Sequence, residues 1–310
     1  MSNISYLHIN GKEIQYTLNQ QGTDFIIYNS ANDRTIVGNQ EVIEYIRNHP
    51  TIDNTSPLFD FVENKKKLKI WDFHIFSTTL NSQQIAGLSG FSKVTTNPII
   101  VMISLVVSLY FLFFGFNIRF PESPTGIEYL KFLAILYPIQ LVIAFFHEMS
   151  HFYYYNKNFR PQRVRFGLTL RYFSMLLFFT NVPFMNSLTY EKKQKLILAG
   201  IYTQITLMGV LSVLALTFQD ISTNMYFIFI FIINLGSILT NLIPFLRLDG
   251  FWFISNFLKV DNYMHSYLNI LKKKASFNLL IFIMGTLNII FIVITILYSA
   301  YGIWIILQSI

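Results

Sequence analysis

The residues best suited to chemistry lie together in one apolar stretch, as His147-Glu148-Met149-Ser150-His151. Residues four positions apart share one face of an α-helix, so both imidazoles can reach the same metal ion. Glu148 follows the first histidine directly and is placed to accept a proton from a water molecule there. The alternative, that these groups only stabilise helix contacts, is disfavoured because burying them unpaired is costly. The spacing therefore predicts a metal site, with zinc as the expected ion and Glu148 as a general base.

A third protein ligand is expected from elsewhere in the chain, because catalytic zinc sites commonly use three protein ligands. Outside the basic loops, the acidic residues of the apolar part other than Glu148 are Glu122, Glu128, Asp220 and Asp249. In the membrane topology described below, the first three lie at the outer face. Asp249 and the two histidines instead lie toward the cytoplasmic ends of their segments, so Asp249 is the predicted third ligand. The alternative is an ion pair between Asp249 and Arg247 at the membrane interface.

The composition points to a membrane protein. The 310 residues are 53% hydrophobic and only 13% charged, whereas soluble domains carry about 25% charged residues. Cysteine is absent, which excludes disulfides, thiolate metal sites and a cysteine nucleophile. The net charge of +7 arises after residue 95, because the polar part before it is close to neutral. This distribution argues against a nucleic-acid-binding surface on the polar part.

Five segments are long and apolar enough to cross a bilayer, which takes about 20 residues. They are residues 94–118, 130–155, 196–219, 221–246 and 275–310. Basic loops mark the cytoplasmic side of a membrane protein. Lysine and arginine are concentrated in residues 156–171, 189–195 and 255–274, so these three loops are expected in the cytoplasm. The N-terminus is then inside and the C-terminus outside.

A sixth apolar stretch, residues 172–188, cannot be a full span in this topology, because it would place three lysines of 189–195 outside. It is therefore expected to be a re-entrant or hairpin element packed against protein. The predicted fold is a multi-pass α-helical membrane protein with about five spans and this hairpin. No signal peptide is expected in the first 20 residues. The expected location is the cell membrane, with the N-terminus in the cytoplasm.

The polar part is predicted to be a small α+β domain of residues 1–93, followed by a membrane domain of residues 94–310. Short β-rich runs bounded by turn residues predict four strands, at Tyr6–Ile9, Ile14–Leu18, Phe25–Tyr28 and Thr35–Val37. Asn39 is a suitable cap for a helix that continues through Arg47. A second helix is expected to begin at Ser56-Pro57.

Two motifs together resemble a known family. The later one reads Asn241-Leu242-Ile243-Pro244-Phe245-Leu246-Arg247-Leu248-Asp249-Gly250. With the histidine motif, it is similar to the site-2 protease superfamily of intramembrane zinc metalloproteases, whose patterns are His-Glu-x-x-His and Asn-x-x-Pro-x-x-x-Leu-Asp-Gly. The resemblance covers residues 130–258, and Ala199-Gly200 also looks like the small-residue helix start of that family. A further glycine of the family is replaced here by Phe251, which puts the local backbone in doubt but not the ligand.

The resemblance implies roles for five residues. His147, His151 and Asp249 would bind Zn²⁺, and Glu148 would be the general base and later the proton donor. Asn241 would hold the substrate backbone or stabilise the oxyanion. The alternative for Asn241 is an interhelical hydrogen bond.

The N-terminal part resembles the small winged-helix, PqqD-like domains that grip leader peptides during maturation of ribosomally made peptides. The expected activity is therefore zinc-dependent endopeptidase cleavage of a secreted peptide precursor near the cytoplasmic side of the bilayer. Cleavage of a membrane-bound regulator is the alternative, and a metal-binding transport or immunity protein is the alternative outside enzymes. The expected partners are a peptide or single-span protein and the lipid bilayer, with no nucleic acid; the oligomeric state stays open.

Overall fold

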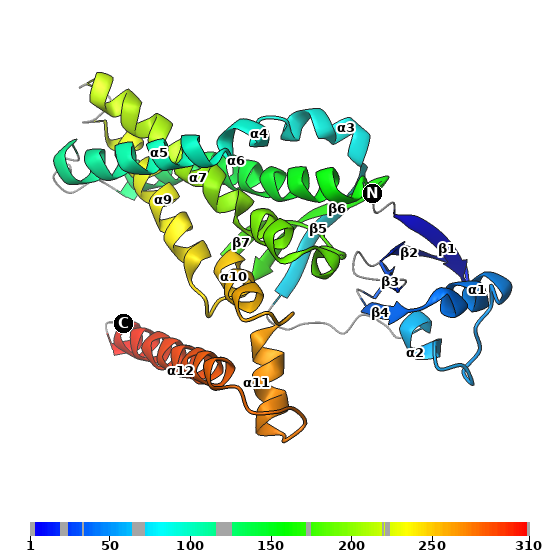
Figure 1. Cartoon of the computed structure of the whole chain (residues 1–310). Coiled ribbons are helices and arrows are strands. Elements are labelled where there is room, and N and C mark those ends of the chain that lie inside the picture. Colours follow the sequence, from blue (N-terminus) through cyan, green and yellow to red (C-terminus); the bar gives the residue numbers. More distant parts are fainter. Residues whose placement is uncertain are drawn as a thin grey trace. The chain divides into compact units, whose positions relative to one another are not determined.

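The computed structural model describes residues 4–18, 24–32, 34–63, 72–115, 126–171, 175–218, 220 and 224–308. The chain is mostly helical and contains two small antiparallel sheets (Figure 1). Contacts divide it into two units, Met1–Asn234 and Leu235–Ile310. Each unit is described by itself below. The division of the chain between residues 93 and 94 stays a prediction.

The first sheet forms the N-terminal part of the chain and has the order β1-β2-β3-β4. Its strands pair antiparallel with their sequence neighbours. They are β1 (Ser5–Ile9), β2 (Lys12–Leu18), β3 (Phe25–Asn29) and β4 (Arg34–Gly38), so the four predicted strands are confirmed. The predicted helix is α1 (Gln40–Asn48), and the Asn39 side chain caps it by accepting a hydrogen bond from the Val42 amide.

The second predicted helix is α2 (Phe59–Glu63), which is fixed to the sheet by polar contacts. Asn10 donates to Glu63 at 2.9 Å, and the Lys12 ammonium lies 2.9 Å from the same carboxylate. These hydrogen bonds, first from Asn10 and then from Lys12, hold the pKa of the Glu63 carboxyl below its usual range. The apolar core of this part includes Ile9, Ile14, Ile27 and Ile43, which are almost fully buried.

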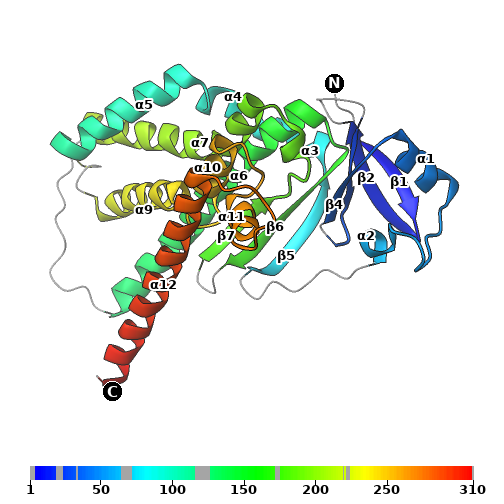
Figure 2. The same ribbon diagram turned by 60° about the horizontal axis from the view of Figure 1, so that its bottom comes forward.

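The second sheet has the order β5-β6-β7, with β5 (Asp72–Asn81), β6 (Arg163–Arg171) and β7 (Met175–Thr180). β5 and β6 are antiparallel, and their register joins Asp72 to Arg171 and Asn81 to Arg163. Hence a strand that precedes residue 93 pairs with one from the apolar part, and Figures 1 and 2 show the two side by side. Residues 172–174, between β6 and β7, lie outside the described residues.

The prediction of a loop over residues 156–171 was wrong for its second half. Residues 163–171 read Arg-Val-Arg-Phe-Gly-Leu-Thr-Leu-Arg, in which polar and apolar residues largely alternate, as in a half-buried strand. The loop was inferred from the number of lysine and arginine residues, and this alternation was not considered. The hairpin predicted within residues 172–188 was placed wrongly: β7 is the one strand among the described residues of that stretch, and its partner β6 begins at residue 163.

Short helical segments, α3 (Ser82–Ala86), η1 (Gly87–Ser89) and α4 (Ser92–Thr95), lead into the apolar helices. These are α5 (Pro98–Tyr110) with a π-helical continuation η2 (Phe111–Gly115), α6 (Gly126–Phe159), α7 (Tyr190–Thr217) and α9 (Met225–Leu242). A 3₁₀ turn, η3 (Met185–Ser187), precedes α7.

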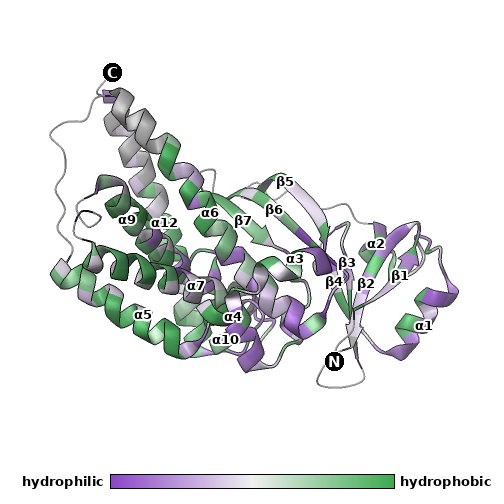
Figure 3. Ribbon diagram, turned by 90° about the horizontal axis from the view of Figure 1, so that it is seen from above, coloured by the Kyte–Doolittle hydropathy of each residue, from purple (hydrophilic) through white to green (hydrophobic). Residues whose placement is uncertain are grey.

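Three helical segments of the described chain are long and apolar enough to cross a membrane: Pro98–Gly115, Tyr190–Thr217 and Met225–Leu242. They match three of the five predicted spans, and Figure 3 shows the hydrophobic colour of α5 and α9. Within the apolar windows, 61% of α7 is buried but only 22% of α5. α7 is therefore the internal helix, against which both α5 and α6 pack.

The helix α6 also forms the core of the first unit. Met149, Phe152, Tyr155 and Phe159 on this helix are buried in one apolar cluster that also includes Ile26 and Tyr28 of the N-terminal sheet. Their spacing of three or four residues places them on one stripe of the helix. The helix that carries the histidine motif is thus packed directly against the N-terminal part.

The second unit contains α10 (Asp249–Phe257), α11 (Tyr263–Leu271) and α12 (Leu279–Gln308), the last of which is a long uninterrupted helix in Figure 2. The break after α9 is held from within this unit. The Tyr263 hydroxyl donates to the Pro244 carbonyl at 2.8 Å, and the buried Asn288 amide donates to the Phe245 carbonyl at 3.0 Å. These bonds satisfy carbonyls that the helix break leaves without helical partners.

Candidate metal centre

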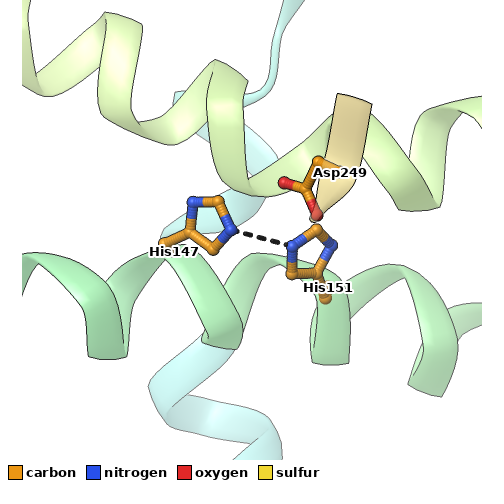
Figure 4. A group of neighbouring side chains, drawn as sticks. All are labelled: His147, His151 and Asp249. Atoms are coloured by element: carbon orange, nitrogen blue, oxygen red, sulfur yellow. Dashed lines mark hydrogen bonds between the residues drawn. The ribbon is translucent and has the colours of Figure 1, made fainter. Parts of the chain in front are cut away.

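The two motif histidines lie in the middle of the second half of α6, one turn apart on the same face. Both side chains are buried, with 7% of each residue exposed. Their Nε2 atoms are 3.1 Å apart, and Figure 4 shows the two rings turned toward each other. Two imidazole nitrogens bound to one tetrahedral zinc ion are about 3.3 Å apart, since each bond is about 2.0–2.1 Å long. The spacing of the pair therefore fits a shared metal ion.

The other ring nitrogens fix which atoms face the metal position. Nδ1 of His151 lies 2.7 Å from the Leu196 carbonyl oxygen, which can only accept a hydrogen bond. Nδ1 of His147 lies 3.0 Å from Oε1 of Gln204. With a metal ion bound at the Nε2 atoms, both Nδ1 atoms would carry the proton and donate it to these acceptors. The backbone and a buried amide of α7 thus orient both rings.

Asp249 is the third residue of the group. One ligand atom from each of His147, His151 and Asp249 lies within 4.8 Å of the others (Figure 4). Two neutral imidazoles and one carboxylate form a donor set that suits Zn²⁺ and other first-row divalent metals. This group could therefore hold a metal ion, whereas the identity of the ion as zinc stays a prediction.

Glycine at position 200 allows α7 to approach the first histidine. A Cβ atom on Gly200 would overlap the His147 ring at Cε1, Nε2 and Cδ2. The residue is fully inside the helix and buried. The small-residue pair Ala199-Gly200 noted in the sequence therefore has a physical reason here, because any side chain at 200 would occupy the space of the imidazole.

Glu148, the residue after the first histidine on α6, is held by strand β7. Its Oε2 accepts a hydrogen bond from the Thr180 amide at 2.9 Å, and its own carbonyl accepts one from the Thr180 hydroxyl at 3.2 Å. The carboxylate is only partly buried. Hydrogen bonds to an ionised carboxylate are among the stronger ones in proteins, so this contact fixes the rotamer of the predicted base.

Asn241 lies in the last turn of α9, partly buried, and the three-residue metal group does not include it. A Cβ on Gly250 would run into the backbone carbonyl groups of Asn241 and Leu242. Glycine at 250 therefore permits the chain to fold back closely on the end of α9. Phe251, the departure from the family pattern, is 1% exposed, and its ring lies 4.6 Å from that of Tyr263. The larger side chain is thus accommodated by packing within the second unit.

Sequence reasoning missed the residues that support the histidines. Gln204 is 1% exposed in an apolar helix. Its backbone carbonyl accepts a hydrogen bond from the side-chain amide of the fully buried Asn234 at 3.0 Å. Ser150, between the two ligands, joins a buried hydroxyl chain with Ser92 at 3.0 Å and Thr203 at 2.7 Å. The available signal was the presence of a buried amide and hydroxyls in otherwise apolar segments, which are costly unless bonded.

Searches of protein-family models, of curated proteins and of solved structures found no match to this chain. The interpretation of the site therefore depends on its own residues and their geometry.

Proposed function

We propose that this protein is an intramembrane zinc-dependent endopeptidase of the site-2 protease type. The observation that carries the proposal is the pair of buried imidazoles, each with Nδ1 bonded to an acceptor of α7 and with Nε2 atoms 3.1 Å apart. A glutamate follows the first of them directly in the sequence, and α7, which orients both rings, is long and apolar enough to cross a membrane. Together these features support hydrolysis at a metal site inside a bilayer more than simple metal storage.

The chemistry would be divided between the metal and Glu148. When bound by His147, His151 and Asp249, zinc would polarise the scissile carbonyl and make water acidic enough to deprotonate near neutral pH. Glu148 accepts the proton of the attacking water and then delivers it to the leaving nitrogen. Asn241 is proposed to hold the substrate backbone. Because a helix hides its carbonyls in internal hydrogen bonds, the substrate must be extended at the point of cleavage.

Strand β7 offers the edge on which such an extended segment could lie. It ends the second sheet within the described part of the chain. The Asn181 amide donates back to Arg165 on the β6 side, so the alternating residues 176, 178 and 180 turn their amides away from β6. The outward amide of Thr180 is the one that reaches Glu148. A strand paired with this edge would therefore pass beside the general base.

A variant of β7 tests this placement. Leu176→Pro removes an outward amide without removing a bond to β6, and proline is tolerated at such edge positions. Cleavage should fall while zinc content stays unchanged, and Leu176→Ala is the matched control for the lost side chain. Equal cleavage by both variants would count against pairing of the substrate with β7.

The substrate class and the topology complete the proposal. The N-terminal sheet packs on the motif helix, which supports a role in substrate handling and favours a secreted peptide precursor over a membrane-bound regulator. The N-terminal part, residues 1–93, would act as a PqqD-like, leader-binding domain in the cytoplasm. Residues 94–310 would form the membrane domain, with five spans in the cell membrane and the C-terminus outside.

The test is zinc per chain in the purified protein, measured together with cleavage of leader-bearing and single-span reporter proteins. The wild type should bind about one zinc ion. His147→Ala and Asp249→Ala should lose zinc, whereas Glu148→Gln should keep zinc and lose cleavage. Glu191→Gln, at the exposed start of α7, is the control for loss of a carboxylate. A folded wild type that takes up no zinc would overturn the proposal and favour a transport or immunity role.

A further inference from the structure

A polar cavity of about 340 Å³ lies between the N-terminal sheet and the second sheet, within the first unit. β2 contributes Glu13 and Gln15, β3 contributes Tyr28, and β6 contributes Arg163 and Arg165. Asn181, the residue directly after β7, also lines it and donates to the Tyr28 hydroxyl at 2.7 Å. The volume is at the lower end of the range for ligand pockets and is large enough for one or two amino-acid side chains.

The charges of this cavity favour an anion. Arg163 and Arg165 are two positions apart on β6 and so face the same side of the sheet. Among the described residues that line the cavity, Glu13 is the one acidic residue. Its Oε1 lies 3.9 Å from Nη1 of Arg163, which is long for an ion pair, and both side chains are substantially exposed, at 39% and 62%. The described lining of the cavity therefore contains two guanidinium groups and one carboxylate.

The donor geometry favours a carboxylate in particular. A guanidinium presents a planar fork of N–H groups that matches the two oxygens of a carboxylate. Arg165 is oriented on its strand by a hydrogen bond to the Ser77 hydroxyl at 3.1 Å. The Gln15 and Asn181 amides add neutral donors to the same wall. The buried Tyr155 contributes to the lining from α6 and limits the depth of the cavity.

The cavity lies at a defined distance from the general base. Tyr155 is seven residues after Glu148 on α6, a rise of about 10 Å at 1.5 Å per residue. An extended peptide advances about 3.3 Å per residue, so about three residues span this distance. Thr180 bonds Glu148 and its neighbour Asn181 lines the cavity, so one bound strand could contact both places.

We infer that this cavity binds a carboxylate of the peptide substrate, about three residues from the bond that is cleaved. The inference rests on the proposed endopeptidase function for the position of that bond, but not for the binding itself. The carboxylate is either an acidic side chain or the C-terminal group of a peptide. Arg163 and Arg165 hold it, and Glu13 limits the affinity by competing for Arg163.

The experiment measures binding by the full-length Glu148→Gln protein, so that cleavage does not interfere. The probes are three labelled dodecapeptides of Ala and Ser with a blocked N-terminus, followed by fluorescence anisotropy. The first has a central Glu and an amidated C-terminus, the second has Gln in its place, and the third has Gln and a free C-terminal carboxylate. The first or the third should bind at least about tenfold more tightly than the second, and which of them does so identifies the source of the carboxylate.

Variants then assign the binding to the cavity. Arg163→Gln and Arg165→Gln should each weaken binding of the preferred peptide about tenfold, and Glu13→Gln should strengthen it. Lys93→Gln, an exposed position on α4, removes the same charge outside the cavity and should have no effect. Arg165→Glu should change the preference of the cavity from a peptide with a central Glu to a peptide with a central Lys. Zinc content and thermal unfolding of each variant show whether the fold is kept.

Equal binding of all three peptides, no binding at all, or binding that is unchanged in both arginine variants would overturn the inference. These outcomes are separate from the proposed function. A protein that binds the acidic peptide through its arginines but takes up no zinc would retain the cavity as a peptide site and reject the peptidase. A protein that binds zinc and cleaves, but does not prefer peptides with a carboxylate, would support the peptidase and reject the carboxylate site.

Discussion

Substituting Gly200 by alanine tests whether the contact between α7 and the first histidine is essential. A Cβ at this position would lie 2.6 Å from His147 Cδ2 and closer still to two other ring atoms, whereas ordinary contacts are 3.4–4 Å. The ring must therefore move by about 1 Å, because the backbone of a buried helix gives way less easily than a side chain. A shift of this size separates Nε2 from the position it shares with His151.

We expect Gly200→Ala to weaken zinc binding by about 10–100-fold, the range seen when the partners that orient metal ligands are removed. Cleavage should fall by about 100-fold, as a misplacement of about 1 Å can cost that much. The helical conformation of α7 would be stabilised, because alanine is more favourable than glycine in a helix interior by about 1 kcal/mol. The predicted signature is therefore loss of metal affinity without loss of fold.

The assay is a zinc competition titration with a chelator, together with thermal unfolding of the zinc-free protein. Gly236→Ala is the matched control, because it lies within α9, and a Cβ there would meet nothing within 4 Å in the described chain. That variant should bind zinc as the wild type does. If Gly200→Ala also bound zinc with wild-type affinity, the position of His147 against α7 would be wrong.

Three other substitutions give distinct results. Gln204→Leu removes the acceptor for Nδ1 of His147 and should lower zinc affinity about 10–100-fold, whereas Gln204→Glu should keep it, as a zinc competition titration would show. Thr180→Pro removes the backbone donor to Glu148 and should lower kcat about tenfold with zinc content unchanged; Thr180→Val keeps the amide, and an equal loss in both would refute the role of the amide. The pKa of Glu63 is lower in the folded protein than its ordinary value of 4.5. The ionised carboxylate therefore stabilises the folded protein at pH values above 4.5, and this contribution is lost as the pH falls through the folded-state pKa. Thermal unfolding between pH 3 and 6 should therefore show a smaller pH dependence in Glu63→Gln, and identical profiles would contradict this.

The elements with strong local signals were predictable from the sequence. The N-terminal strands and the helix capped by Asn39 follow from β-rich runs and a capping residue, and both are confirmed. The candidate metal ligands were predictable because ionisable side chains are rare in apolar segments. Three of the predicted spans coincide with helices that are long and apolar enough. The number of spans and their direction stay predictions.

What the sequence did not reveal depends on contacts between distant segments. The pairing of β5 with β6 joins residues more than 80 positions apart, and no local pattern specifies such a partner. The role of Gln204 depends on which face of α7 meets α6, and apolar residues lie on all sides of the later part of α7, so their pattern does not identify that face. The place of Glu148 against Thr180 likewise requires the hairpin to be in position first.

The long-range pairing of β5 also has a consequence for synthesis in the cell. The strand leaves the ribosome before its partner, since Asn81 pairs with Arg163 and Asp72 with Arg171. At about 5–20 residues per second, β5 waits on the order of 5–20 s for β6 to be made. During that interval α5 and the whole of α6 are also translated. Phe73 and Phe76, which stay more than half exposed even in the folded chain, make the waiting strand prone to aggregation. The yield of folded protein should therefore depend on how quickly translation reaches β6.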